Sequence, residues 1–410
     1  MNWLKTLQEK QLQDFLDRGL PTRREERWKY TDVSTLSFPR RRESIPASHE
    51  NNNSERLFAI DSRLRGNDSI NIVFIDGLFS SGYSNLKNLP SEVTACSIHE
   101  ALPRLQSYLS KELDVQRYPF AVLNTAHLND GLFLHIPKNC VLKTPIHCLY
   151  LSTENNFSSH LRNIVVADAN SQCVLIEEYT AQAQEYFTNT VTQIFLNENA
   201  QLHYYKIQDE SMAANHIANI IVEQKKDSRL KSFSLAKGAL LAREDFHVKL
   251  QEPGAFCSLL GLYHLTENKQ HMDNHLYVDH LSENGTSSML YKGILDKKSH
   301  AVFNGKVYVE KGAQKTNAYQ ANHNLLLSND AQIDTKPELE IYAEDVKCAH
   351  GATIGQLDSE SLFYLCSRGI EKNAAKKLLT HAFAEEIIGK IEHPNIMQYI
   401  QQRVKQHEEY

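Results

Sequence analysis

A cysteine and a histidine stand two residues apart towards the C-terminal end of the chain, at Cys348 and His350. In an extended segment, residues i and i+2 point to the same face, so the thiol and the imidazole would lie side by side. Such a pair could ligate a soft or borderline metal such as iron, or the imidazole could help to deprotonate the thiol. The plainer interpretation is a buried structural cysteine beside a hydrogen-bonded histidine, and these two residues alone favour it.

A denser group of metal-ligand types lies in residues 263–280, YHLTENKQHMDNHLYVDH. It holds two aspartates and four histidines: His264, His271, Asp273, His275, Asp279 and His280. Imidazole and carboxylate groups are common ligands of zinc and iron. Spacings of two to seven residues would distribute these side chains over different faces of a strand-rich fold, so polar ladders and exposed positions are favoured over a metal site.

Two further carboxylates, Glu338 and Glu340, alternate with Leu339 and Ile341. The alternation is typical of a half-buried strand. Paired carboxylates could bind iron or act as acid and base, but a solvated strand face is the favoured interpretation.

Several motifs of nucleotide binding and catalysis are absent from the sequence. There is no G-x-x-x-x-G-K-[ST], no G-x-G-x-x-G, no H-E-x-x-H and no G-x-S-x-G. The chain is therefore not expected to hydrolyse nucleotide by a P-loop mechanism, nor to be an enzyme by itself.

The composition narrows the class of protein and its partners. The 410 residues are 41% hydrophobic and 23% charged, with a formal net charge of −6, so a sizeable core is expected and nucleic acid is a poor partner. Seven irregularly spaced cysteines without a C-x-x-C argue against a disulfide framework. The charged, amphipathic N-terminus is unlike a signal peptide and no apolar run is long enough to span a bilayer, which predicts a cytoplasmic protein without membrane contact.

A repeat organises the middle of the chain. A turn-forming residue followed by a small one recurs about every 28 residues, at Asn170-Ser171, Asn199-Ala200, Asp227-Ser228, Gly254-Ala255, Asn284-Gly285 and Gly312-Ala313. Most of these pairs follow a β-type run, and a fixed period over six units indicates stacked modules. We therefore predict a right-handed parallel β-helix (β-solenoid); the alternative is a β-sandwich with regular hairpins.

Three regions follow from this organisation. Residues 1–125 form an N-terminal helical and mixed region, with helices expected near 2–20 and 97–113 and an exposed insertion at 38–69. Residues 126–355 form the β-helix core, and residues 356–410 form a C-terminal helical unit. In that unit Leu379, Phe383 and Ile387 recur at four-residue spacing, an apolar stripe that is either packed on the solenoid or reserved for a partner.

Three segments carry a resemblance to a known family. Residues 335–370, TKPELEIYAEDVKCAHGATIGQLDSESLFYLCSRGI, closely resemble the signature of the SufB/SufD scaffold family of the SUF iron–sulfur cluster assembly system. The stretch ending AFAEEIIGKI is similar to the C-terminal helices of that family, and PTRREERWKYT at 21–31 is similar to its N-terminal signature. CAHGAT at 348–353 resembles the SufD form rather than the SufB form.

The resemblance implies a fold, partners and a site. It implies a right-handed parallel β-helix that pairs with a SufB-like sister subunit, and a SufC-like ATPase docked on the C-terminal helices, for which Leu379, Phe383 and Ile387 are the candidates. It implies that His350 lies at the interface where a cluster assembles, as a metal ligand, with Cys348 nearby.

A non-catalytic scaffold without a stably bound cofactor follows from the resemblance, with iron or an iron–sulfur cluster held only transiently at the SufB interface. Alternatives remain open: a SufB-like main scaffold, a homodimer when the chain is alone, or a β-helix enzyme acting on carbohydrate.

Overall fold

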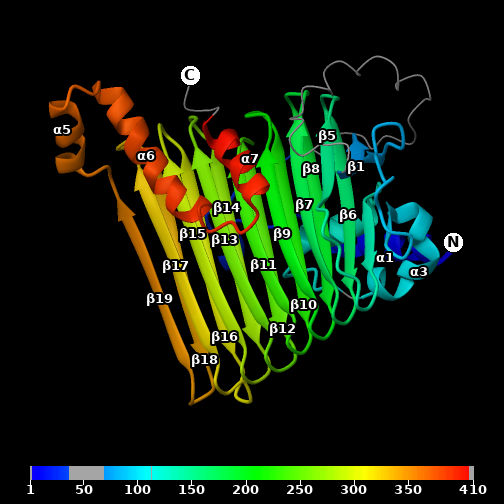
Figure 1. Ribbon diagram of the computed structural model, residues 1–410. Coiled ribbons are helices and arrows are strands. Elements are labelled where there is room, and N and C mark those ends of the chain that lie inside the picture. Colours follow the sequence, from blue (N-terminus) through cyan, green and yellow to red (C-terminus); the bar gives the residue numbers. More distant parts are fainter. Residues whose placement is uncertain (1, 37–68, 112, 406–410) are drawn as a thin grey trace.

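The computed structural model describes residues 2–36, 69–111 and 113–405. The predicted insertion at 38–69 lies, apart from Ser69, outside the described residues. The chain folds as a β-solenoid whose coils stack from β1 to β19, flanked by helices at both ends of the sequence (Figure 1). The predicted solenoid is confirmed over the sandwich alternative. Within each sheet, neighbouring strands such as β7 and β9 pair in parallel, and the strand that lies between them in the sequence belongs to the other sheet.

Two sheets make up the solenoid, and each coil contributes one strand to each sheet. The first, sheet A, contains β1 (Ile70–Ile75), β2 (Leu78–Phe79), β5 (Ile146–Ser152), β7 (Gln172–Ala181), β9 (Gln201–Asp209), β11 (Arg229–Lys237), β13 (Phe256–Leu265), β15 (Thr286–Leu295), β17 (Asn317–Leu326) and β19 (Lys347–Gly355). The second, sheet B, contains β3 (Thr94–Ser97), β4 (Leu132–Ile136), β6 (Phe157–Ala167), β8 (Tyr186–Leu196), β10 (Asn215–Gln224), β12 (Leu241–Leu250), β14 (His271–His280), β16 (His300–Val309) and β18 (Gln332–Ile341). At the N-terminal end, β2 pairs antiparallel with β1, and β3 pairs antiparallel with β4.

Turn residues fix the corner where sheet B passes into sheet A. Of the six predicted turn residues, five have a positive φ, between 55° and 74°: Asn170, Asn199, Asp227, Gly254 and Asn284. Glycine and asparagine tolerate this left-handed conformation, which explains their choice. The sixth corner differs, because Lys315, three residues after Gly312, takes the positive φ of 59°.

Successive side chains of each strand point alternately into the solenoid and outwards, which creates one core between the sheets and two outer faces that the helices cover. Inward side chains such as Leu175, Val222 and Leu259 fill the space between the sheets. On the outer face of sheet A, Ile176, Tyr205 and similar residues pack against α6 (Lys372–Ile388) and α7 (Pro394–Lys405).

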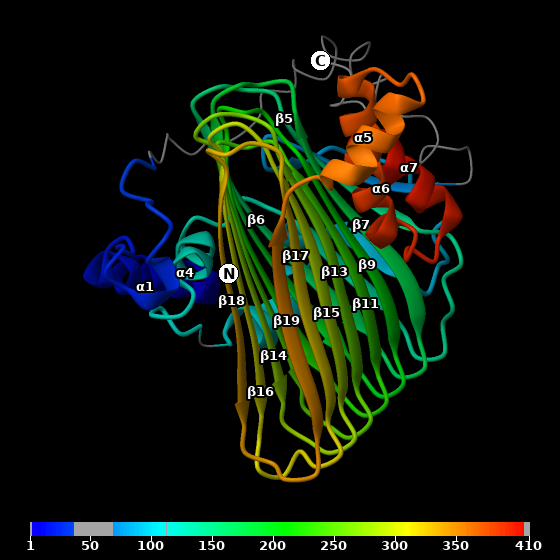
Figure 2. The same ribbon diagram turned by 90° about the vertical axis from the view of Figure 1, so that its left-hand side faces the viewer.

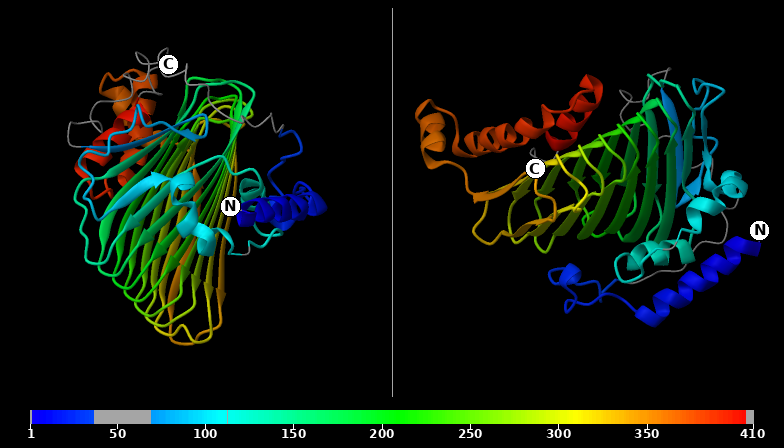
Figure 3. Two further views of the ribbon diagram at one scale, coloured as in Figure 1. Left: turned by 90° about the vertical axis from the view of Figure 1, so that its right-hand side faces the viewer. Right: turned by 90° about the horizontal axis from the view of Figure 1, so that it is seen from below.

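The N-terminal elements cover the outer face of sheet B. They are α1 (Asn2–Arg18), the short 3-10 helix η1 (Glu26–Trp28), α3 (Ile98–Leu109) and α4 (Pro119–Ala126). Figures 2 and 3 show that these elements and the C-terminal helices lie on opposite sides of the solenoid. The expected boundary at residue 126 is corrected at one point: β1, at residues 70–75, already pairs with β5 and belongs to the solenoid sheet.

Candidate functional site

The last coil of the solenoid carries the predicted Cys348 and His350. Both lie on β19, the edge strand of sheet A, at the end that faces the viewer in Figure 2. Cys348 packs against the interior core, and His350, two residues on, faces the same side of the strand. The spacing therefore places both side chains on one face of the strand, as predicted. The structure shows that this face is the inner side of the sheet, at the last coil of the solenoid.

The environment of the Cys348 thiol does not activate it. Its side chain is half-buried, and this burial raises the pKa of the thiol above its usual value. A raised pKa keeps the sulfur protonated at neutral pH, so the neighbouring imidazole does not make it a thiolate. His350 itself is exposed on the edge strand and reaches solvent.

One apolar and one polar side chain of the preceding strand lie in register with this pair. In the pairing of β17 with β19, Ala318 lies opposite Cys348 and Gln320 lies opposite His350. Gln320 is fully buried in the interior. The site therefore consists of an exposed imidazole above one buried amide. Across the described residues, no three His, Cys, Asp or Glu side chains are grouped to hold a metal ion.

The second predicted group, in residues 263–280, is divided among three faces. His264 lies on sheet A, and His280 lies in the interior with its Nε2 2.8 Å from Ser287 Oγ. The other members lie on the outer face of sheet B, since β14 alternates sides. Asp273 and Asp279 bond to Arg243 and His247 of the neighbouring strand β12, as expected for polar ladders, the favoured interpretation.

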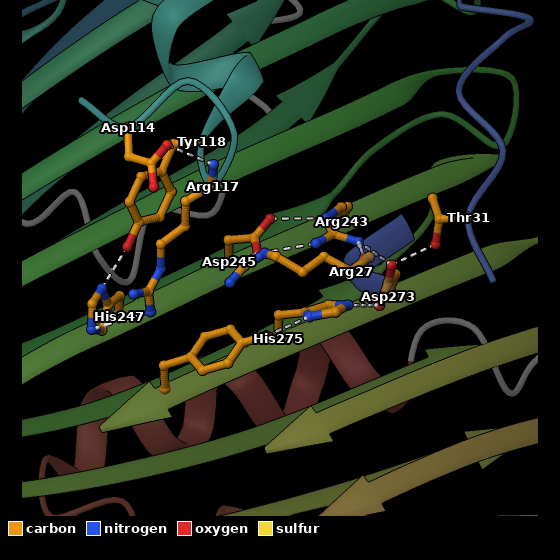
Figure 4. A network of polar contacts seen from close by, with 11 residues as sticks. Arg27, Thr31, Asp114, Arg117, Tyr118, Arg243, Asp245, His247, Asp273 and His275 are labelled. Atoms are coloured by element: carbon orange, nitrogen blue, oxygen red, sulfur yellow. Dashed lines mark hydrogen bonds and ion pairs between the residues drawn. The ribbon is translucent and has the colours of Figure 1, made fainter. Parts of the chain in front are cut away.

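Those outer-face residues belong to a buried charge network beneath the N-terminal segment (Figure 4). Arg243 of β12 donates from Nε and Nη2 to Asp245, at 2.8 and 3.0 Å, and from Nη1 to Asp273 at 2.5 Å. His275 Nε2 lies 2.8 Å from the second oxygen of Asp273. The Arg243 charge helps to lower the pKa of both aspartates, against burial, which raises it.

The N-terminal segment is fastened to this network. Arg27 Nη2 donates to Asp245 at 2.9 Å, and Thr31 donates to Asp273. The guanidinium carbon of Arg243 lies 3.8 Å from the ring centre of Trp28, a side chain that is only 2% exposed. The PTRREERWKYT segment, residues 21–31, therefore acts locally as an anchor against sheet B.

The third predicted pair, Glu338 and Glu340, lies on the outer face of β18. Glu338 Oε1 is 2.6 Å from Lys336 Nζ, and Glu340 pairs with Lys306. Both carboxylates are partly exposed and ion-paired on the strand surface, which agrees with the solvated strand face favoured from the sequence.

The apolar stripe of α6 is split between two environments. Ile387 is fully buried against sheet A and Phe383 packs on the same cluster under the Lys292 ammonium, which lies 3.8 Å from its ring centre. Leu379 is half-buried. The prediction that these three side chains form one docking face is therefore corrected: the alternative of packing on the solenoid holds for Ile387 and Phe383.

Exposed apolar side chains lie elsewhere in the C-terminal region. On α5 (Ser359–Ser367), which buries none of its residues, Phe363 is 75% and Tyr364 57% exposed, and Leu378 of α6 is 50% exposed. On the last coil itself the exposed large side chains are Tyr319, Ile341, Tyr342 and Ile354. Sequence reasoning missed these positions because the helical stripe gave no indication of which face the solenoid would cover.

The C-terminal helix α7 is held by a buried carboxylate. Glu178 of β7 accepts from Tyr399 Oη at 2.6 Å and from Arg403 Nη2 at 2.7 Å, and it lies 2.8 Å from His147 Nε2. Glu178 and Arg403 are 225 residues apart in sequence. No local pattern could have predicted this contact.

The sequence also matches known protein families. A family model described as "SUF system FeS cluster assembly, SufBD core domain" matches residues 150–383, and one for the "SufBD protein N-terminal region" matches residues 1–148. None of the described helices is long and apolar enough to cross a membrane.

Named relatives cover most of the chain. An iron–sulfur cluster assembly SufBD family protein of Synechocystis sp. is 37% identical over 388 residues, 91% of this chain and 84% of that protein. The protein ABCI7, chloroplastic, of Arabidopsis thaliana is 30% identical over 98% of this chain and 86% of its own length. The iron–sulfur cluster assembly protein SufD of Escherichia coli is 28% identical over 96% of this chain and 91% of its own length. With both family models and these relatives spanning the solenoid and its flanking regions, the chain belongs to the SufBD family of SUF-system iron–sulfur cluster assembly proteins.

Proposed function

We propose that this chain is the SufD-type scaffold subunit of a SUF complex, that it performs no catalytic step of its own, and that it pairs through its last coil with a SufB-type sister subunit. The observation that carries the proposal is the uncapped end of the solenoid. β18 and β19 are the edge strands of their sheets, and none of their residues is buried.

An uncapped coil favours a partner of the same architecture. Edge strands present free backbone N–H and C=O groups that another strand can bind. The exposed Tyr319, Tyr342 and Ile354 add apolar area at this end. A second solenoid could extend both sheets and cover these side chains at once.

Assembly of iron and sulfide is assigned to the same end. His350 lies on the exposed inner side of β19, where a ligand from a sister subunit could meet it. The described residues hold no complete ligand set, so we propose that iron or a nascent cluster is cargo shared across the interface and not a resident cofactor. Cys348, with its raised thiol pKa, is assigned a neighbouring and not a nucleophilic role.

A SufC-type ATPase is proposed to dock on the exposed face of α5 and the adjoining turn of α6. Phe363, Tyr364 and Leu378 supply apolar area there that the chain itself leaves uncovered. Nucleotide-driven movement of two docked ATPases would then pull on α6, which contacts β13 and β15 directly.

Co-expression with SufB-type and SufC-type partners tests the proposal. We expect a complex whose native mass corresponds to all three subunits, and a loss of the ATPase alone from the variant Phe363→Asp. Leu16→Asp is the matched control, since Leu16 is 62% exposed on α1, on the opposite side of the solenoid. Retention of the ATPase by Phe363→Asp would rule out this docking face.

A SufB-type role is the second candidate, because the similarity to the named relatives does not distinguish a SufD-type subunit from a SufB-type subunit. Co-purification separates them: a SufD-type chain recruits a distinct SufB-type subunit, whereas a main scaffold reconstitutes a cluster with the ATPase in the absence of any sister. His350→Ala should abolish cluster reconstitution in the three-subunit complex while leaving the fold intact, since the side chain is exposed. Normal reconstitution by this variant would remove His350 from the mechanism.

A further inference from the structure

One amide in the interior of the solenoid lacks every hydrogen bond that it could make. Gln320 on β17 is fully buried, and neither Nε2 nor Oε1 has a partner. An unpartnered buried polar group costs roughly 1–3 kcal/mol, so such an amide is retained against a stability cost. Thr335 Oγ1, on β18 of the same end coil, is a second buried atom without a partner.

The other inward amides of the same strand are satisfied, which makes Gln320 an exception. Asn322 Nδ2 donates to Tyr263 Oη at 3.1 Å and to the Tyr291 carbonyl at 3.2 Å. Asn324 accepts from Tyr263 Oη at 2.5 Å and donates to Asn322 at 2.6 Å. The strand therefore pairs its polar groups two and four residues further on, and leaves unpaired the one that lies in register with His350.

The opposite sheet makes room for this side chain. A Cβ atom at Gly305 of β16 would lie 1.9 Å from Gln320 Nε2, so only glycine permits the amide to lie where it does. The amide reaches across the interior to sheet B, one strand below the exposed His350.

We propose that Gln320 is a positioning residue for His350, an inference that rests on the proposed function of the open end. Neighbouring strands are about 4.8 Å apart, so the two side chains are adjacent on the inner side of sheet A. A histidine that binds a metal through one ring nitrogen usually donates its other N–H to a carbonyl or carboxylate, which fixes the tautomer and the ring orientation. In the assembled complex, Gln320 Oε1 would accept that N–H, and the second ring nitrogen of His350 would then be free to bind the metal.

The test is an anaerobic equilibrium titration of Fe²⁺ into the complex of this chain with its SufB-type and SufC-type partners. Removal of a partner of a metal-ligating histidine typically weakens metal binding 10- to 100-fold, and we expect a loss of that order for Gln320→Leu. Gln320→Glu retains an oxygen acceptor and should keep most of the affinity. Gln208→Leu is the matched control, because Gln208 is also a buried interior glutamine with an unpartnered Nε2, on the distant β9.

A double-mutant cycle separates positioning from a structural role. In the His350→Ala background, Gln320→Leu should cause no further loss of Fe²⁺ affinity, and in the isolated chain it should not lower the thermal midpoint, because it removes an unsatisfied buried amide. Unchanged affinity in Gln320→Leu, or an equal loss in both backgrounds, would overturn the proposal while leaving the role of His350 intact. Unchanged affinity in His350→Ala alone would instead overturn the proposed function, and the role of Gln320 with it.

Discussion

The contact between α7 and sheet A allows a quantitative prediction from the variant Arg403→Leu. Arg403 Nη2 forms an ion pair with Glu178, whose side chain is 0% exposed, and the Arg403 side chain is 18% exposed. Removal of one member of a buried ion pair costs about 3–5 kcal/mol, because the remaining charge stays out of water. Glu178 keeps Tyr399 and His147, and Arg403 is partly solvated, so we expect the lower end of this range, about 3 kcal/mol.

The assay is urea unfolding followed by circular dichroism, with limited proteolysis to report release of the C-terminal helix. Arg368→Leu is the matched control: Arg368 also lies over a tyrosine ring, 5.4 Å from the centre of Tyr364, but on the exposed α5. The control should change the free energy of unfolding by less than about 0.5 kcal/mol. Adding Glu178→Gln to Arg403→Leu should restore part of the loss, since no buried charge is left.

The pH dependence supplies an independent check of the same contact. Burial raises the pKa of Glu178, but the His147 hydrogen bond and the charges of His147 and Arg403 lower it by more. The net pKa of this carboxyl is therefore below its usual value. A carboxylate with a lowered pKa stabilises the fold above its unfolded pKa of about 4.3, and this contribution is lost as the pH falls through the folded value. In Arg403→Leu the loss should begin at a higher pH. Equal stability of Arg403→Leu and the unmodified protein across pH would refute the reasoning.

Three further predictions address other parts of the molecule. Trp28→Ala should destabilise the fold by about 3–5 kcal/mol and open the segment around residue 28 to protease, because the ring is buried against Phe120 and Arg243; an unchanged digestion pattern would contradict the anchor. Lowering the pH from 6.5 to 4 should reduce the free energy of unfolding. Burial lowers the pKa of three histidines in the folded protein to about 4, so in this range the unfolded chain takes up protons that the folded chain does not: His203, His271 and His280. Urea midpoints at pH 7 and 5 measure this difference. Alkylation of the native protein should spare the three cysteines with buried side chains and raised pKa, and mass mapping should find adducts at Cys348 before any of them: Cys148, Cys173 and Cys257.

The sequence predicted the solenoid because its period is a local signal repeated many times. Each corner needs a residue that tolerates a positive φ, and asparagine, aspartate or glycine recurs there at five of the six expected positions. The prediction was wrong at the sixth position, Gly312. That corner contains extra residues, and Lys315 takes the left-handed conformation instead. The helices expected near 2–20 and 97–113 are present as α1 and α3, displaced by a few residues at their ends.

The sequence could not predict which side of each helix the solenoid would cover. α6 reads as one apolar stripe, yet Ile387 is buried while Leu378, one helical position from Leu379, stays exposed. α4 has no exposed face, because all eight of its residues, including Asn124 and Thr125, are buried between α1 and sheet B. Its apolar pattern therefore could not show which side contacts the sheet. For the site, the C-x-H spacing predicted that Cys348 and His350 share one face of a strand, but not that this face is the inner one. The unpaired amide of Gln320 depends on packing across the interior, which no local pattern shows.

The corners also determine how this architecture can change in size. A coil takes 27 residues between Arg229 and Phe256 but 31 between Thr286 and Asn317, while the strands that it contains keep nearly the same length. Length is thus absorbed where the chain bends, and a whole coil could be gained or lost without disturbing its neighbours. Each coil therefore adds about 4.8 Å to the length of the solenoid, and the number of coils sets the separation between the anchored N-terminal segment and the open end.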